Sequence, residues 1–225
     1  MNTKKLLLFA ALCLVLVAAL IGYEGGLFRG LQEGDLYGSW LTEIPAEEHV
    51  EQNLAQIGIT YDAPHDLTMA YEFTFKEDGT VTVRIERESA KKLAAIQENA
   101  VREGMPELMY TRYETEGGLS REEADAMLAD QGLTMETMVE MTLEQINFEG
   151  RYTSEEMTVT QYYCLQDGIL CYASTEEALH SGTYDMTVEP QRSGKTLVLS
   201  NAFDSEGNPF YGSGGIKYPL TLTEK

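Results

Sequence analysis

The sequence is poor in cysteine, histidine and basic side chains. Its 225 residues include three cysteines, three histidines, and 16 lysines and arginines against 37 acidic residues. Neither a Cys-x-x-Cys pair nor a Cys/His cluster occurs, so the sequence gives little support for a zinc site, and no cofactor is expected. The formal net charge of −21 repels phosphate backbones, which argues against nucleic acid as a partner.

Recognisable catalytic arrangements are also missing. Ser89-Ala90-Lys91-Lys92 matches the Ser-x-x-Lys pattern of acylating enzymes, but the accompanying Ser-Asp-Asn and Lys-Thr-Gly motifs are absent. Ser89 is better explained as a helix cap. With no nucleophile, base or metal group in a known arrangement, we expect a noncatalytic protein and name no catalytic residues.

Long apolar runs are rare, and the longest stands at the N-terminus. Leu6–Tyr23 is 18 residues without a charge, preceded by Lys4 and Lys5. This length lies between that of a signal peptide and that of a spanning helix, and the lysines orient the rest of the chain outward. Residues 1–23 are therefore either a single-pass membrane anchor with the C-terminal domain outside, or a signal peptide cleaved near Val17-Ala18-Ala19, which leaves a secreted protein. Residues 24–34 form a linker, and 35–225 form the domain.

Period-two alternation indicates two β regions. In the first, Tyr71, Phe73 and Phe75 alternate with polar residues, and the pattern resumes after the turn at Glu77-Asp78-Gly79. A first strand is expected over 35–42. In the second region, expected from about Phe148, Asp167-Gly168 is a two-residue hairpin turn. That turn sets Leu165 opposite Leu170, Cys164 opposite Cys171 and Tyr163 opposite Tyr172. Pro190 to Gly194 reads as another turn, and the last strand is expected from Ile216 to Leu222.

Between these regions the apolar spacing becomes helical, over about 87–147. Ser89 opens the first helix, and Gly104 and Pro106 interrupt it. Ser120 with Glu123 forms a capping box, and Thr134 opens a last helix. A separate helix is expected from Pro45 to about Ile57.

A meander of this size tends to close on itself, because closure removes exposed strand edges. We expect a mainly β fold: an antiparallel barrel of about eight or nine strands with an α-helical insertion. Both flanks of the insertion must then join one sheet, with Phe75 and Val83 in the same core as Tyr172 and Leu220.

Gly38-Ser39-Trp40 resembles the Gly-x-Trp near the start of lipocalin-like barrels. The hairpin from Tyr71 to Ile85 is similar to that of small lipocalin-like domains in exported bacterial proteins. The resemblance implies that Trp40 closes one barrel end, with Lys217 as the basic residue laid over it. It also implies a barrel that holds a small apolar ligand. The helical insertion has no counterpart in ordinary lipocalins.

The expected barrel interior is rich in bulky side chains, which allows either a filled core or a small ligand pocket. Buried tyrosine hydroxyls need partners, and this favours a pocket. We expect ligand contacts, if the pocket exists, from Tyr163, Tyr172, Tyr184 and Phe73. Cys164 and Cys171 are either joined by a disulfide or packed as two thiols.

The helical block holds six of the ten methionines. Methionine surfaces adapt to varied partners, so Met135, Met138 and Met141 are candidates for binding a protein or an unfolded peptide. The alternative is that these helices pack against the barrel wall and cover the Asp167-Gly168 hairpin, which is apolar on both faces. The leading expectation is an extracytoplasmic binding module for a small apolar ligand. A chaperone-like or envelope-assembly role for the helices is second, and an enzyme is third.

Overall fold

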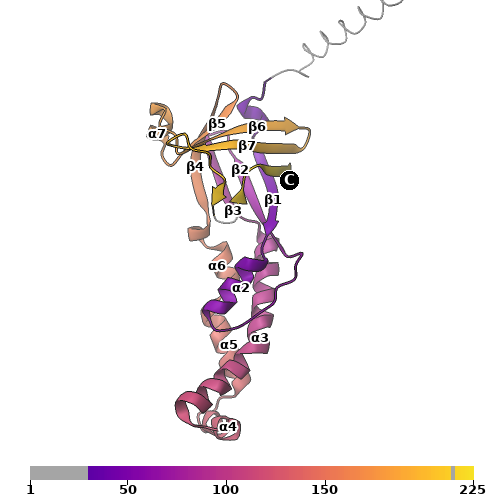
Figure 1. Cartoon of the computed structure of the whole chain (residues 1–225), viewed down its shortest axis with the longest axis vertical. Coiled ribbons are helices and arrows are strands. Elements are labelled where there is room, and N and C mark those ends of the chain that lie inside the picture. Colours follow the sequence, from indigo (N-terminus) through magenta and orange to yellow (C-terminus); the bar gives the residue numbers. More distant parts are fainter. Residues whose placement is uncertain (1–29, 214–215) are drawn as a thin grey trace, which may run out of the picture.

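The computed structural model describes residues 30–213 and 216–225 (Figure 1). The expected N-terminal signal or anchor segment, 1–23, and most of the linker lie outside these residues. Within the described ranges, no helix is both long enough and apolar enough to cross a membrane.

Eight strands form one closed antiparallel barrel, as the sequence predicts. Their order around the barrel is β1-β10-β7-β6-β5-β4-β3-β2, so most neighbours are also consecutive in the chain. A separate two-stranded ribbon, β8 (Gly212–Ser213) with β9 (Ile216–Lys217), precedes the last strand. The barrel strands are β1 (Gly38–Pro45), β2 (Thr68–Phe75), β3 (Thr80–Ile85), β4 (Val159–Gln166), β5 (Ile169–Ala173), β6 (Met186–Ser193), β7 (Thr196–Asp204) and β10 (Leu220–Glu224).

The two hairpins expected from alternation have the expected register. Phe73 pairs with Val83 across β2 and β3, and Gly79 turns the chain with a φ of 77°. Across β4 and β5, Cys164 pairs with Cys171 and Tyr163 with Tyr172. Asp167 and Gly168 both take positive φ values, 52° and 82°, which a two-residue turn between twisted strands requires.

Some strand limits differ from the prediction. The first strand begins at Gly38, after a short 3₁₀ turn η1 (Glu33–Asp35). Pro190 does not turn the chain: β6 continues to Ser193, and Pro190 pairs with Leu199 beside a bulge, where a missing N–H is tolerated. The last predicted strand is split into β9 and β10 around Tyr218 and Pro219.

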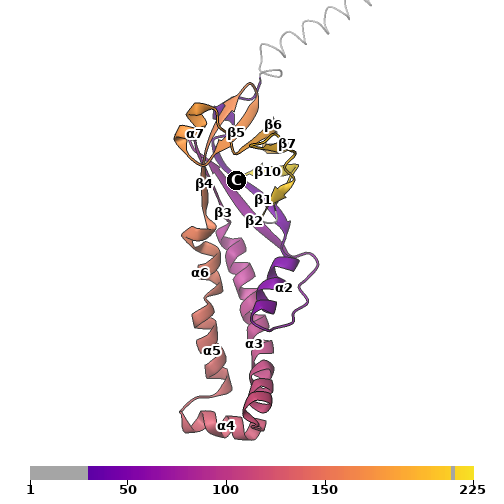
Figure 2. The ribbon, with the colours of Figure 1, turned by 60° about the vertical axis from the view of Figure 1, so that its left-hand side comes forward.

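Four helices project from one end of the barrel as an arm, with α4 at its far tip (Figure 2). A shorter helix, α2 (Glu47–Gln56), lies beside its base and confirms the helix expected after Pro45. The capping box at Ser120 and the cap at Thr134 are also confirmed. The arm comprises α3 (Arg87–Gly117), α4 (Arg121–Asp130), α5 (Met135–Ile146) and α6 (Phe148–Thr153).

The prediction that Gly104 and Pro106 interrupt the first helix is wrong. Helix α3 runs through both as one segment of 31 residues. Met105 is buried, and a Cβ on Gly104 would lie 3.1 Å from Cγ2 of Ile59, so the helix packs closely on the chain that follows α2. Tertiary packing at this point offsets the loss of one backbone hydrogen bond at proline.

The prediction of a strand from Phe148 is also wrong. Asn147 ends α5 with a φ of 46°, and its side chain accepts a hydrogen bond from Gly150 N at 3.0 Å, which starts α6 at once. A 3₁₀ turn, η2 (Glu155–Met157), follows, and β4 begins only at Val159. The insertion is therefore about ten residues longer than 87–147.

The molecule has two hydrophobic cores. Phe75, Tyr172 and Leu220 belong to the barrel core, and Val83 packs against it, so both flanks of the insertion do join one sheet. The arm has its own core, built from α2, α3, α5, α6, the chain between α2 and β2, and the adjoining ends of β1, β2 and β3. Tyr71 packs against both cores.

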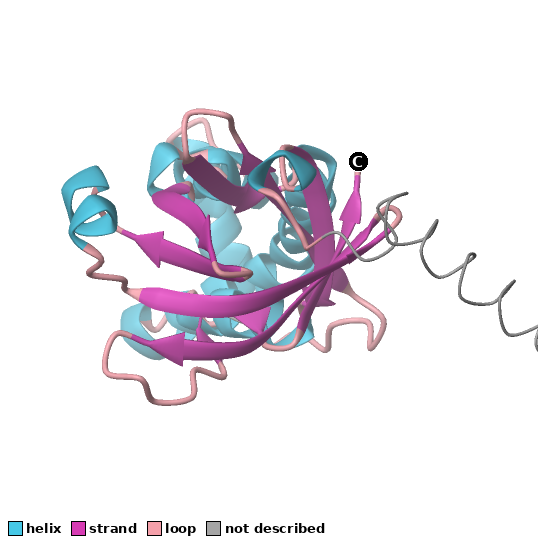
Figure 3. Ribbon diagram, turned by 90° about the horizontal axis from the view of Figure 1, so that it is seen from above, coloured by secondary structure: helices cyan, strands magenta, loops and turns pink. Residues whose placement is uncertain are grey.

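The expectation that the helical block covers the apolar hairpin is wrong. The arm leads away from the barrel, and its helices bury their apolar stripes against one another and against α2 (Figures 1 and 2). The hairpin is instead contacted by a short helix, α7 (Glu176–Ser181), which packs on β4 and β5 and is seen at the side of the barrel in Figure 3. Ile169 stays 40% exposed.

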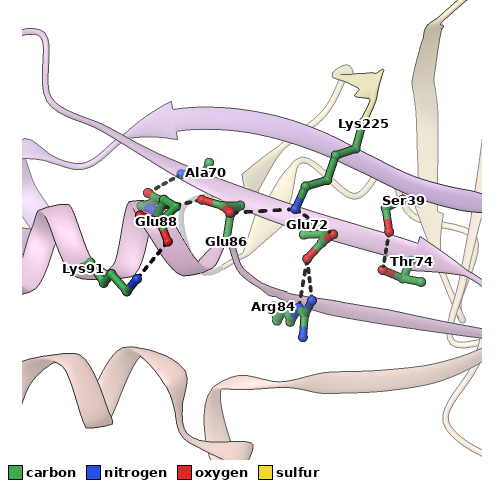
Figure 4. Close-up of polar contacts among 10 residues, drawn as sticks. Ser39, Ala70, Glu72, Thr74, Arg84, Glu86, Glu88, Lys91 and Lys225 are labelled. Carbon is green, nitrogen blue, oxygen red and sulfur yellow. Dashed lines mark hydrogen bonds and ion pairs between the residues drawn. The ribbon is translucent and has the colours of Figure 1, made fainter.

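A buried carboxylate on the outer wall fastens the C-terminus to β2 (Figure 4). The Glu72 side chain is only 6% exposed and forms ion pairs with Arg84 at 2.7 Å and Lys225 at 3.2 Å. Burial alone would raise the pKa of Glu72, but hydrogen bonds from both cations outweigh burial and leave the pKa below its ordinary value. Nearby, Glu86 rather than Ser89 caps α3; Ser89 instead accepts a hydrogen bond from Ala70 N of β2.

Candidate ligand site at the open end of the barrel

One end of the barrel is closed by Trp40. Its side chain is fully buried with Leu36, and Nε1 donates a hydrogen bond to the Leu36 carbonyl at 2.7 Å. The Arg192 guanidinium lies over the indole, 5.1 Å from the ring centroid, within cation–π range. A basic residue therefore does cover Trp40, but it comes from β6 and is not Lys217.

Arg192 is held in this position by three acceptors. Its Nε donates to the Gly194 carbonyl at 3.0 Å, Nη1 to the Asp35 carbonyl, and Nη2 to Glu224 at 3.3 Å. Lys217 is exposed on β9 and lines a separate surface cleft of about 740 Å³ beside α2. Sequence analysis missed Arg192 because its position opposite Trp40 depends on how the barrel closes.

The barrel interior next to Trp40 is filled by side chains. The Phe75 and Tyr163 rings meet edge to face, with centroids 5.0 Å apart. The Tyr163 hydroxyl donates to the Lys76 carbonyl at 2.9 Å, and burial raises its pKa far above the ordinary value, so it stays neutral. The large buried polar side chains at this end are therefore partnered, Trp40 by the Leu36 carbonyl and Tyr163 by the Lys76 carbonyl.

The opposite end opens into a pocket of about 500 Å³, at the end of the barrel from which the arm projects. This volume lies within the usual range for small-molecule sites, about 300–1,000 Å³. Strands from both β regions contribute, as do η2 and the chain between β7 and β10. The lining residues are Tyr71, Phe73, Val83, Met157, Val159, Gln161, Asp185, Met186, Asp204, Phe210, Ile216 and Tyr218.

Aromatic rings make up much of this lining. Phe210 and Tyr218 lie with ring centroids 6.0 Å apart, tilted by 55°. Burial raises the pKa of Tyr218 to about 12 and also raises the pKa of Tyr71, so both hydroxyls are neutral at physiological pH. Met157 and Val159 at the rim are 39% and 52% exposed, which leaves apolar surface open to solvent at the entrance.

Two carboxylates and an amide are the polar side chains among the aliphatic and aromatic ones. Asp204 pairs with Met186 across β6 and β7, so the two share the inward face. Asp204 Oδ1 accepts hydrogen bonds from the backbone N–H groups of Glu206 and Asn208 at 2.9 and 2.8 Å. The pKa of Asp204 is lowered, and the hydrogen bond from the Asn208 backbone is the largest cause. Asp185, just before β6, accepts a hydrogen bond from Ser174 N at 2.6 Å.

The predicted ligand residues are distributed over the whole barrel. Phe73 lines the pocket. Tyr172 is buried and pairs with the lining residue Met186, and its hydroxyl has no hydrogen-bond partner within the described residues. Tyr163 belongs to the packed end. Tyr184 is half-buried outside the pocket, where its hydroxyl donates to Gln166 at 2.7 Å.

Sequence analysis missed Met157, Asp185, Asp204 and Phe210. Met157 continues the alternation of Val159, Gln161 and Tyr163 but lies in η2, before β4 begins, and the other three lie at the end of β7 or in connections. In the sequence, the apolar residues Phe210 and Ile216 around an otherwise polar loop were the signal that could have indicated the pocket.

Cys164 and Cys171 are free thiols in the structure. Cys171 is buried, and burial raises its pKa to about 11, so its thiolate is scarce at neutral pH. The cysteines lie opposite each other in the register that was expected. They take no part in the pocket.

The arm presents a second surface. Met135 is buried in the arm, whereas Met138 lines a groove of about 440 Å³ with Met109, Arg112, Tyr113, Glu116 and Gly117. Met141 is 44% exposed. None of these three methionines contacts the barrel core.

Among the residues that the structure describes, no group of three histidine, cysteine or acidic side chains is arranged to hold a metal ion. Comparisons with models of protein families, with curated proteins and with solved structures find no match for this chain.

Proposed function

We propose that this protein is a noncatalytic binding protein that holds a small, largely apolar molecule in the open end of its barrel. The observation that carries the proposal is the pocket of about 500 Å³ with an aromatic and aliphatic lining. Burial of such a lining by a ligand stabilises the complex, by roughly 25 cal/mol per Å² of apolar surface removed from water. The exposed rim formed by Met157 and Val159 gives a ligand a way in.

The difference between the barrel ends supports this role. The packed end around Trp40 supplies stability, so the other end is free to remain hollow. A lipocalin-like architecture is part of the proposal: Gly38-Ser39-Trp40 at the start of β1 and Arg192 laid over the indole are what such a barrel would have. The outward location, by anchor or by secretion, remains the proposal that Lys4, Lys5 and the following apolar run support.

Binding can be tested on the full chain in lipid nanodiscs, with its methionine methyl groups labelled for NMR. We expect 1-heptanol, a soluble neutral probe, to shift the Met157 and Met186 signals in a saturable way. Met127 and Met141, on the arm, serve as internal controls, and empty nanodiscs measure partitioning of the probe into lipid. Unchanged Met157 and Met186 signals at saturating probe would refute the proposal.

A pocket-filling variant sharpens this test. Val83→Trp places a large ring in the pocket and should abolish the shift of Met157. Val198→Trp is the matched control, because Val198 lies on β7 among the strand residues that do not line the pocket. Equal binding by both variants would show that the probe sits elsewhere.

The second candidate function is the binding of a protein or unfolded peptide by the arm, in a chaperone-like or assembly role. The groove at Met138 and the exposure of Met141 favour it. The same methyl spectra test it: an unfolded polypeptide should shift Met138 and Met141 and leave Met157 and Met186 unchanged. The reverse pattern would count against the arm.

A further inference from the structure

We infer that the molecule held in the barrel mouth carries a positive charge, as an amine or quaternary ammonium group on an apolar body. This inference rests on the proposed function and adds to it a class of ligand. Its basis is the combination of Asp185 and Asp204 with aromatic rings in one pocket, whose lining, among the residues that the structure describes, includes no basic side chain.

The first step concerns the partners of the two carboxylates. Asp204 receives its hydrogen bonds from the backbone N–H groups of Glu206 and Asn208 and from the Asn208 amide at 3.3 Å. Asp185 receives one from Ser174 N. All of these donors are neutral. Within the described ranges, no lysine, arginine or histidine forms an ion pair with either aspartate.

Some carboxylates elsewhere on this chain do have cationic partners. Glu72 on the outer wall has Arg84 and Lys225, and Glu224 at the packed end has Arg192. Only 16 basic residues are available against 37 acidic ones, so many surface carboxylates must stay unpaired in solvent. Two such groups at an apolar pocket differ from the rest, because a ligand bound there would displace the water that solvates them.

The second step concerns the neutral part of the lining. Tyr71, Phe73, Phe210 and Tyr218 place four aromatic rings in the lining, and the quadrupole of an aromatic ring attracts a cation to its face. The hydroxyl groups of Tyr71 and Tyr218 stay protonated, since burial holds the pKa of each above the ordinary value. The negative charge of the pocket therefore comes from the two aspartates, and the rings add attraction for a cation without repelling its apolar part.

The third step concerns the alternatives. An anionic amphiphile such as a fatty acid would bring a third negative charge beside Asp185 and Asp204, and like charges at this range repel. A neutral molecule would fill the pocket but leave both carboxylates without a counter-charge. A cation alone satisfies both the rings and the carboxylates, and the net charge of −21 also favours its approach.

The test uses three probes of seven carbons that differ in head group: heptylammonium, 1-heptanol and heptanoate. Each is titrated into the full chain in nanodiscs while the Met157 and Met186 methyl signals are followed. Attraction by two carboxylates and the rings predicts that heptylammonium binds about tenfold more tightly than 1-heptanol at low salt, and heptanoate more weakly than either. Salt at about 0.5 M should reduce this preference.

The variant for this test is Asp185→Asn/Asp204→Asn, which keeps the shape of both side chains and the acceptor oxygen that each turn uses. It should lose the preference for heptylammonium and keep its affinity for 1-heptanol. The matched control is Asp62→Asn/Asp130→Asn, which removes two charges from exposed positions outside the pocket and should keep the preference. Circular dichroism checks that each variant is folded. If the double variant does not fold, Asp204→Asn alone should reduce the preference for heptylammonium over 1-heptanol by about twofold or more.

The outcomes separate the two proposals. Equal binding of heptylammonium and 1-heptanol to the wild-type chain would overturn the positive charge and leave the apolar-ligand proposal standing. A preference that survives in the double variant would overturn the role of the two aspartates. Binding of none of the three probes would remove both proposals together.

Discussion

The two ends of this barrel are built from the same strands but are packed differently. At the packed end, Trp40 is fully buried, its indole N–H is bonded, and Arg192 covers the ring. At the open end, Phe210 and Tyr218 are only half-buried, and a pocket of about 500 Å³ remains. The contrast shows how a small barrel divides its interior: one half is filled by packed side chains, and the other keeps a pocket.

Removing the large side chain at each end gives the largest expected effect. Trp40→Ala should lower the free energy of unfolding by about 3–5 kcal/mol, because it empties a fully buried site. Phe210→Ala should cost about 1 kcal/mol, since the ring is half-buried already. Equilibrium urea unfolding of the full chain measures both. Comparable losses at the two ends would show that the open end is packed as tightly as the closed one.

A pH series tests whether the ion pairs of Glu72 stabilise the outer wall of the barrel, which joins its two ends. Ionised Glu72 is favoured in the folded state, since its pKa lies below the ordinary value. The stabilisation is therefore complete above the unfolded pKa of about 4.3 and is lost as the pH falls through the folded pKa. Glu72→Gln should cost about 1–2 kcal/mol at pH 7.

As the pH falls through the folded pKa of Glu72, the difference between Glu72→Gln and wild type should shrink, because the wild-type side chain then also becomes neutral. Glu88→Gln is the control, since its pKa is also lowered but its pair with Lys91 is exposed. A gap between wild type and Glu72→Gln that does not change with pH would contradict the electrostatic explanation.

Replacing the cation over the indole tests the identity of the residue that closes the barrel. Arg192→Met should cost about 1 kcal/mol, from the loss of the cation–π contact and of hydrogen bonds that are partly open to solvent. Lys217→Met should change stability by less than about 0.5 kcal/mol, as expected for an exposed side chain. Urea unfolding at low and high salt compares them. A larger loss at Lys217 would restore the assignment drawn from sequence.

Sequence predicted the parts of this fold that depend on local information. The hairpins at Gly79 and at Asp167-Gly168 have alternating strands and a turn within about 20 residues, so their register follows from the chain itself. The capping box at Ser120 is equally local. Closure of the barrel was predicted from the number of strands and not from the pairing of any two particular strands.

The rest depended on contacts between distant segments. Helix α3 continues through Pro106 because Ile59 and the arm core hold it, and no nearby residue reveals that. Arg192 meets Trp40 only once β6 and β1 share a barrel. The pocket joins η2, the start of β6 and the loop before β10, which are far apart in the chain, so no local pattern places Asp204 at a pocket.

Two neighbouring tyrosines give the smallest and sharpest test of the difference between the ends. Tyr163 and Tyr172 pair across β4 and β5, and both are buried. The Tyr163 hydroxyl donates to the Lys76 carbonyl, whereas that of Tyr172 has no partner in the described parts of the chain. Tyr163→Phe should therefore cost about 1 kcal/mol, because it removes a hydrogen bond and leaves the Lys76 carbonyl with only its bond from Gly79 N, and Tyr172→Phe should be neutral within about 0.5 kcal/mol.

Because the two substitutions remove the same atom from adjacent positions, differences in helix or strand propensity and in exposed surface cancel. Urea unfolding without any added ligand measures both variants. A loss of about 1 kcal/mol for Tyr172→Phe as well would mean that its hydroxyl is partnered in the absence of ligand, for instance by ordered water in the pocket. The open end would then be a solvated polar cavity, and the apolar part of the binding proposal would have to be withdrawn.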